Sequence, residues 1–116
     1  MTVLPPSRDE ILAAGPLEVM PDEHLARING DALMLSLVEL RMLTELARRA
    51  DRVVSRKELS TAVWGREFRP GDRSIDVYVH KLRVKLEDAL PGWSCIHTHS
   101  GFGYRLWPQA QAPKRK

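Results

Sequence analysis

The residues best suited to chemistry lie in the run RSIDVYVHKLRVKLEDAL, residues 73–90. Advancing 100° per residue gathers the following side chains on one side of an expected helix: Arg73, Val77, His80, Lys81 and Val84, with Ser74 and Tyr78 at the margin. A solvent-facing helix side is normally rich in carboxylates and lysines, whereas this one combines bases, hydroxyls and valines. Cations can meet phosphates and guanine edges, and an outward methyl group can pack against the thymine methyl. The side therefore suits a DNA major groove; the alternative is an ordinary basic outer face.

The opposite side of the same helix is apolar. Its residues recur at spacings of four, three, four and four, and they are Ile75, Val79, Leu82, Leu86 and Leu90. At 3.6 residues per turn these positions form one stripe, which we expect to face the core. Asp76, in the first turn, has a charge that favours the helix dipole, and orienting an arginine is its alternative role.

A second set of reactive side chains alternates along an expected strand. Cys95, His97 and His99 would share one strand face, an arrangement that raises the hypothesis of a metal site. Three ligands within five residues of one strand give poor tetrahedral geometry, and no fourth ligand is evident nearby. A thiol nucleophile would need an orienting carboxylate and an oxyanion donor, and no pattern supplies them. We therefore expect no metal, no cofactor and no enzymatic activity.

Bulk properties indicate one ordinary globular domain. The 116 residues are 43% hydrophobic and 28% charged, and no apolar run approaches the ~20 residues of a membrane span. The N-terminus lacks the pattern of a signal peptide, and the single cysteine agrees with a reducing compartment. A net charge of +3 leans towards an anionic partner. We expect a cytoplasmic, nucleoid-associated protein with no membrane partner.

The N-terminal part is expected to form a small sheet. Residues 1–15 are predicted to be a linker or flexible arm because they contain a Pro-Pro pair and few apolar residues. Short apolar segments follow at 17–20, 25–28 and 32–35. Asn29-Gly30 is a strong hairpin signal, because both residues tolerate the positive φ of a type I′ turn. These features predict an antiparallel sheet.

Two capping boxes predict the starts of two helices. Ser36 with Glu39, and Ser55 with Glu58, have the S-x-x-E pattern in which each side chain satisfies a free backbone N–H. The second helix is expected to end at Gly65. Residues 66–72 then form a connection longer than that of a simple helix-turn-helix.

The C-terminal part is expected to be a hairpin and a tail. Pro91-Gly92 stops the long helix, and residues 95–107 read as two strands joined by a glycine turn. Residues 109–116 are predicted to be a disordered basic tail.

Three sequence motifs carry a resemblance to a known family. RSIDVYVHKLRVKLED resembles the recognition helix of OmpR/PhoB-type effector domains of bacterial response regulators, which reads R-x-V-D-V-H-I-x-R-L-R-x-K-L-E. VVSRKELSTAVWG resembles the second helix of that family, and IHTHSGFGYRL resembles its wing. The resemblance implies an α+β winged helix-turn-helix spanning residues 16–108. Its parts would be an N-terminal antiparallel sheet, three helices and a C-terminal β-hairpin wing.

The resemblance also implies a function and a set of contacts. A member of this family is a sequence-specific regulator of transcription that binds double-stranded DNA, with the recognition helix in the major groove and the wing at the minor groove. The DNA contacts implied in this chain are Arg73, Ser74, Val77, Tyr78, His80, Lys81, Arg83, Thr98, His99, Ser100 and Gly101. The implied RNA polymerase contacts are Arg66, Glu67, Phe68, Arg69 and Asp72. Head-to-tail binding to direct repeats is implied as well, and a protein-interaction module without specific DNA binding is the alternative.

This chain departs from the family pattern at several positions. The family often has histidine at Tyr78, arginine at His80 and Lys81, and arginine at the wing position of Ser100. Lysine lacks the planar fork with which arginine reads guanine, so we expect a softer base preference and a different target site. A response regulator also carries a receiver domain before this module. We therefore expect an effector domain separated from its receiver, a stand-alone regulator, or the first module of a larger antibiotic-pathway type regulator.

Overall fold

The computed structural model describes residues 10–111. Its elements are β1 (Leu12–Ala14), β2 (Leu17–Met20), the 3₁₀ helix η1 (Pro21–Glu23), β3 (Leu25–Ile28), β4 (Asp31–Ala32), α1 (Leu37–Arg48), β5 (Val53–Val54), α2 (Arg56–Trp64), α3 (Ser74–Ala89), β6 (Trp93–His99) and β7 (Gly103–Ala110). No helix in this part of the chain is long and apolar enough to cross a membrane. The order of strands, three helices and a hairpin is that of a winged helix, as predicted.

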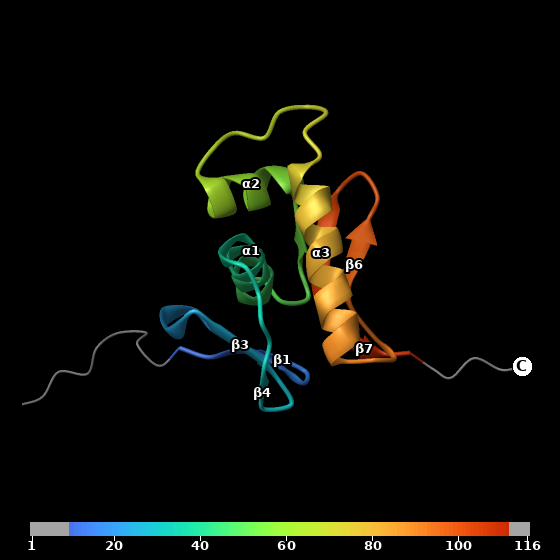
Figure 1. Ribbon diagram of the computed structural model, residues 1–116. Helices are drawn as coiled ribbons and strands as arrows, with labels where there is room; N and C mark the ends of the chain where they lie inside the picture. The colour runs from blue at the N-terminus through green and yellow to red at the C-terminus, as the bar shows by residue number, and fades with distance from the viewer. Residues whose placement is uncertain (1–9, 112–116) are drawn as a thin grey trace, which may run out of the picture.

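The N-terminal strands form an antiparallel sheet in the order β1-β2-β3-β4, which lies beneath α1 in Figure 1. Asn29 and Gly30 have the positive φ angles expected of the turn between β3 and β4. Two predicted boundaries are wrong. β4 ends at Ala32, so residues 33–35 are not a strand, and β1 begins at Leu12, inside the segment predicted to be a linker. Leu12 pairs with Val19, so pairing with β2 makes this weakly apolar segment a strand. Residues 1–9 of the predicted linker lie outside the described residues.

Both predicted capping boxes are present. The Glu39 amide donates to Ser36 Oγ at 3.2 Å while the Ser36 amide donates to Glu39 Oε1 at 2.8 Å, and the same exchange opens α2. Gly65 ends α2 in the left-handed conformation, with φ of 68°. These local signals fix where α1 and α2 begin, so they fix the frame against which α3 packs.

The apolar stripe of α3 is buried, as predicted. Its five residues join the core that α1, α2 and both sheets build. A polar contact adds to this packing, because Lys85 Nζ lies 2.5 Å from Glu39 Oε1, a carboxylate that is only 4% exposed. Burial raises the pKa of Glu39, but the hydrogen bonds from Lys85 and Ser36 outweigh burial and leave that pKa below its ordinary value. α1 and α3 are thereby tied near the start of α1.

The second sheet has the order β5-β7-β6 and forms the C-terminal hairpin. Its register shifts between Ser94 and Ile96, where Trp107 and Pro108 lie opposite the single residue Cys95. β7 continues to Ala110, so the predicted tail starts two residues too early; residues 112–116 lie outside the described part. β5 was not expected as a strand, and its two residues attach the hairpin to the segment between α1 and α2.

Gly103 is required where β5 and β7 meet. Its φ is +146°, and a Cβ at this position would lie 2.1 Å from the carbonyl oxygen of Val54. Only glycine allows the two backbones to approach this closely. The second glycine of the G-x-G-Y motif therefore closes the base of the hairpin turn.

Candidate nucleic-acid interface

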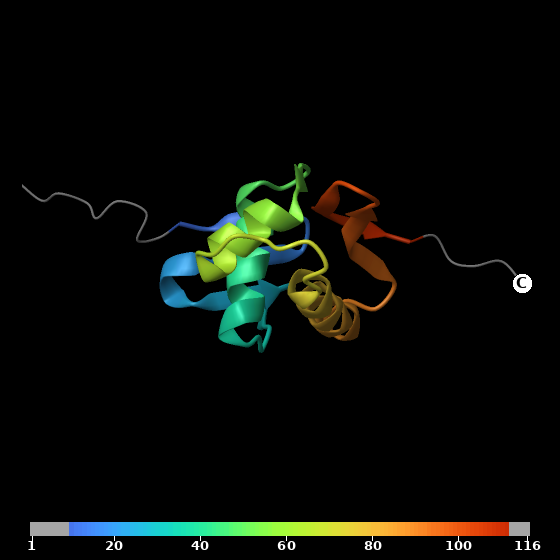
Figure 2. The ribbon, with the colours of Figure 1, turned by 90° about the horizontal axis from the view of Figure 1, so that it is seen from above.

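The outer face of α3 has the composition that the helical wheel predicts. Five of its side chains are exposed: Arg73, Val77, His80, Lys81 and Val84. Val77 is 46% exposed, which is unusual for a valine on a helix whose opposite side is fully buried. Ser74 and Tyr78 are half-buried at the margin, again as predicted. α3 lies between the α1–α2 pair and the β6–β7 hairpin (Figures 1 and 2).

The loop between α2 and α3 holds the N-terminus of α3. The Ser74 amide donates to Asp72 Oδ1 at 2.8 Å, which gives α3 its cap, since Arg73 at the N-cap position makes no such bond. The bond from the Ser74 backbone lowers the pKa of Asp72. Arg66 Nη2 lies 3.7 Å from Asp72 Oδ2. The predicted loop residues Arg66, Glu67, Arg69 and Asp72 line one crevice of about 550 Å³ together with Ser74. Phe68 is half-buried.

A row of contacts between two cations and two aromatic rings runs from this loop onto α3. The Arg66 guanidinium carbon lies 4.8 Å from the centroid of the Trp64 ring, and Trp64 meets the ring of Tyr78 edge-on at 5.8 Å. Lys81 Nζ lies 4.9 Å from the Tyr78 centroid. These contacts hold Tyr78 and Lys81 in place on the outer face.

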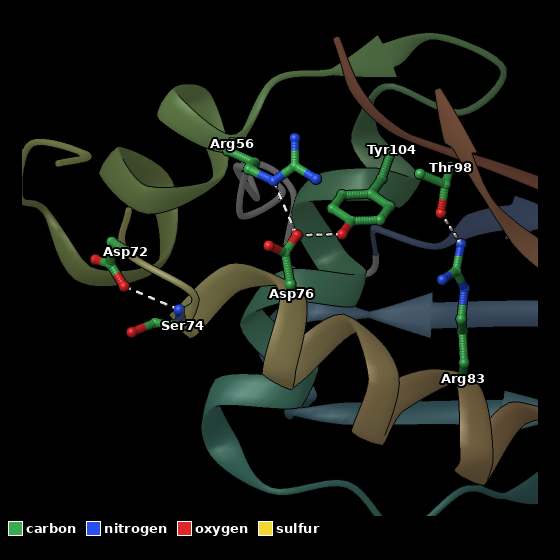
Figure 3. A network of polar contacts seen from close by, with 7 residues as sticks. All are labelled: Arg56, Asp72, Ser74, Asp76, Arg83, Thr98 and Tyr104. Carbon is green, nitrogen blue, oxygen red and sulfur yellow. Dashed lines mark hydrogen bonds and ion pairs between the residues drawn. The ribbon is translucent and has the colours of Figure 1, made fainter. Parts of the chain in front are cut away.

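Asp76 joins three elements. Its Oδ1 accepts hydrogen bonds from Arg56 Nε of α2, at 2.8 Å, and from the Tyr104 hydroxyl of β7 (Figure 3). Burial raises the pKa of Asp76, but the bonds from Tyr104 and Arg56 outweigh burial and lower that pKa. Burial and the neighbouring Asp76 raise the pKa of Tyr104. Asp76 thus orients an arginine, the role that the sequence ranked second, in addition to its place in the first turn.

Arg83 binds the wing. Its Nε and Nη2 donate to the Ile96 carbonyl oxygen at 3.1 and 2.9 Å. Nη2 also donates to Thr98 Oγ1 at 2.6 Å (Figure 3). The guanidinium carbons of Arg56 and Arg83 lie 5.2 and 5.5 Å from the centroid of the Tyr104 ring. Two residues expected to contact DNA, Arg83 and Thr98, therefore bond to each other.

The hairpin turn brings the remaining predicted wing residues together. The Phe102 amide donates to the His99 carbonyl oxygen at 2.9 Å, and Ser100 and Gly101 between them are exposed, while His99 is half-buried. Phe102 is 74% exposed, and it was absent from the predicted contacts. An aromatic residue between two turn glycines has no neighbour to cover it, and this was the sequence signal that could have identified it.

β6 carries Cys95, His97 and His99, the row that raised the hypothesis of a metal site. Cys95 is buried, and burial, with Glu87 adding to it, raises the pKa of its thiol to about 11. His97 Nε2 lies 2.8 Å from the Trp107 carbonyl oxygen. Within residues 10–111 no three His, Cys, Asp or Glu side chains are placed to hold a metal ion.

Comparison with known proteins gives relatives of one kind. Residues 30–106 match the family described as "Transcriptional regulatory protein, C terminal". The sensory transduction protein RegX3 of Mycolicibacterium smegmatis is 34% identical over 98 residues, which are 84% of this chain and 43% of RegX3. The transcriptional regulatory protein PrrA of Mycobacterium leprae is 39% identical over 100 residues, 86% of this chain and 42% of PrrA. The chain thus spans less than half the length of these two curated relatives.

Solved structures agree with the sequence matches. The DNA-binding domain of CpxR from E. coli is 34% identical, with a TM-score of 0.77, and the match covers 84% of this chain and 96% of that one. The Klebsiella pneumoniae RstA DNA-binding domain, solved in complex with the RstA box, is 30% identical, with a TM-score of 0.77 and coverage of 86% and 99%. The family match covers most of the described chain, and the winged helix and the predicted motifs occur in the expected order. This chain belongs to the OmpR/PhoB-type C-terminal domain family of response regulator transcription factors.

Proposed function

We propose that this chain binds double-stranded DNA sequence-specifically and regulates transcription, with α3 in the major groove and the β6–β7 wing at the adjacent minor groove. The observation that carries the proposal is the outer face of α3, where Arg73, His80 and Lys81 stand exposed beside an uncovered Val77. The related RstA DNA-binding domain was solved in complex with its RstA box, which supports DNA binding by this chain.

The face offers both kinds of DNA contact. Arg73 and Lys81 supply charge for phosphates or guanine edges, Ser74 and Tyr78 supply hydroxyls, and Val77 supplies a methyl surface for thymine. On the wing, Ser100 and Gly101 are exposed beside the half-buried His99, which supports their proposed contact with the minor groove. None of the exposed predicted contacts on this face is a carboxylate, and the exposed carboxylates on the same side of α3, Glu87 and Asp88, lie towards its C-terminal end.

Binding is tested on a duplex that the protein itself selects from a random-sequence pool. Lys81→Ala should weaken binding to that duplex and reduce the slope of log K against log salt by about 0.9, the value of one phosphate contact. Arg27→Ala is the matched control, because it removes an equal charge from the exposed face of β3, in the other sheet. Equal effects of the two variants, or no enriched sequence, would contradict the proposed interface.

The loop between α2 and α3 is the proposed RNA polymerase contact. Glu67 and Arg69 are exposed there and line the loop crevice, while the Asp72 bond to Ser74 fixes the loop against α3. Alanine at Glu67 or Arg69 should leave DNA affinity unchanged and lower transcription from a promoter that carries the selected site. A parallel fall in DNA affinity would count against this assignment.

Head-to-tail binding to direct repeats and a cytoplasmic, nucleoid-associated location belong to the same proposal.

A further inference from the structure

We infer that Arg83 is a positioning residue that holds the wing at a fixed angle to the recognition helix, and that it does not act as a phosphate contact. The inference rests on the proposed function, since it concerns how α3 and the wing reach the two grooves together. It reassigns a residue whose place in the family motif suggests direct DNA contact.

The hydrogen bonds of Arg83 already use the edge of the guanidinium that would grip a phosphate. Nε and Nη2 form the side-on fork with which arginine binds an oxyanion in bidentate fashion. In this chain both nitrogens donate to the Ile96 carbonyl oxygen, and Nη2 donates to Thr98 Oγ1 as well. A phosphate could take this edge only if the arginine released the wing.

The wing needs such an attachment because β6 is an edge strand. In the order β5-β7-β6, β7 is the only strand of the described residues that pairs with β6, and β7 is itself bonded through its backbone to the two residues of β5 and to the Asp51 amide. Arg83 supplies the Ile96 carbonyl of this outer edge with two N–H donors. The bond therefore links β6 directly to α3.

A second tie lies closer to the start of α3. Asp76 accepts the Tyr104 hydroxyl and Arg56 Nε, while the Tyr104 ring lies within 5.5 Å of the guanidinium carbons of both Arg56 and Arg83. Positions 76 and 83 are seven residues apart, or about 10 Å along a helix. Two attachments this far apart restrain the angle of the hairpin as well as its distance from α3 (Figure 3).

The test compares Arg83→Lys, Arg83→Met and Thr98→Val on the duplex selected by the unmodified protein. Dimethyl sulfate methylates guanine N7 in the major groove and adenine N3 in the minor groove, so one reagent reports α3 and the wing separately. We expect both Arg83 variants to lose protection of the adenines under the wing and to keep protection of the guanines under α3. Lysine retains the charge but cannot form the fork, so Arg83→Lys should resemble Arg83→Met.

Thr98→Val and one further variant separate positioning from contact. Thr98→Val removes no charge, and it should weaken the same adenine protections while leaving the salt slope unchanged. Lys81→Met serves as the contact control, with a slope lower by about 0.9 and intact adenine protection. The inference is overturned if Arg83→Lys binds and protects as the unmodified protein does while Arg83→Met reproduces the Lys81→Met pattern.

A measurement without DNA keeps the inference separate from the proposed function. Hydrogen exchange of the backbone amides in residues 96–104 should accelerate in Arg83→Lys and Thr98→Val, while the amides in the middle of α3 stay protected. Unchanged exchange in both variants would mean that the wing does not depend on these bonds, whatever the protein binds. Faster exchange with no selected duplex would instead contradict the proposed function alone.

Discussion

Substituting Glu39 and substituting its partner Lys85 should lower the free energy of unfolding by different amounts. Glu39→Gln keeps an oxygen that can accept the Ser36 amide and loses only the charge opposite Lys85. A hydrogen bond to a charged group contributes about 1.5–3 kcal/mol. Lys85 is 40% exposed and can return to water, so the cost should be near the lower limit, about 1.5 kcal/mol. For a domain of about 100 residues this lowers Tm by about 6–12 °C.

Lys85→Met should cost more, because it leaves the carboxylate of Glu39 in place at 4% exposure without its cation. Removing one partner of a buried pair typically costs about 3–5 kcal/mol, partly relieved here by the Ser36 amide. The double variant should recover part of this loss, since glutamine and methionine leave no buried charge. Urea unfolding at pH 7 measures all three values. If Lys85→Met costs no more than Glu39→Gln, the buried carboxylate of Glu39 does not need Lys85 for its stability.

The pH dependence of the same pair has a definite sign. The pKa of Glu39 is lower in the folded state than its ordinary value of 4.5, so its contribution is fully present above pH 4.5 and is lost as pH falls through the folded pKa. The difference in Tm between the unmodified protein and Glu39→Gln should therefore be constant near neutrality and shrink below about pH 4.5. A difference that stayed constant through the acid range would contradict the lowered pKa.

Three further predictions concern the hairpin. Gly103→Ala should lower the free energy of unfolding by well over ~1 kcal/mol in urea titration, because its Cβ meets the Val54 carbonyl, whereas Gly101→Ala, with open space around it, should cost less. Cys95 should react with iodoacetamide far more slowly in the folded than in the unfolded protein at pH 8, since its thiol is buried and its pKa is about 11. Phe102→Ala should weaken binding to the selected duplex without changing Tm, because Phe102 is 74% exposed at the turn, where an apolar side chain can meet the minor groove.

Features encoded within one or two helical turns were predictable from the sequence. The capping boxes at Ser36 and Ser55 depend on residues three positions apart, and the stripe of α3 depends only on helical spacing. Strand ends were less predictable because pairing across the sheet decides them. Leu12 enters β1 because it meets Val19, and Ala110 stays in β7 because it meets Trp93.

The internal use of outward residues could not be predicted in this way. A helical wheel places Arg83 at the edge of the buried stripe, next to Leu90, but it does not reveal that a carbonyl 13 residues later lies within reach. The same holds for Asp76, whose partners are 20 and 28 positions away along the chain. A family motif identifies such residues, but it does not distinguish a residue that contacts the ligand from a residue that positions the contacting side chains.

The distinction between contacting and positioning residues affects how strongly the domain should bind unrelated DNA. Arg83 is bonded to the wing, and Arg105 Nη1 lies 3.3 Å from Asp51 Oδ1, so two cations of the motifs are engaged within the protein. Arg73 and Lys81 remain as the permanent charges of the proposed α3 contacts, which gives a slope contribution of about 2 in log K against log salt. Non-specific DNA binding derives mainly from contacts between cations and phosphates, so binding to unrelated DNA should be weak at physiological salt. Affinity for a selected site should depend on base contacts and groove shape. A titration with random-sequence competitor DNA measures both quantities. Weak non-specific binding is contradicted if the competitor binds nearly as tightly as the selected duplex. The count of two charges is contradicted if the salt slope for the selected duplex approaches that of a highly cationic domain.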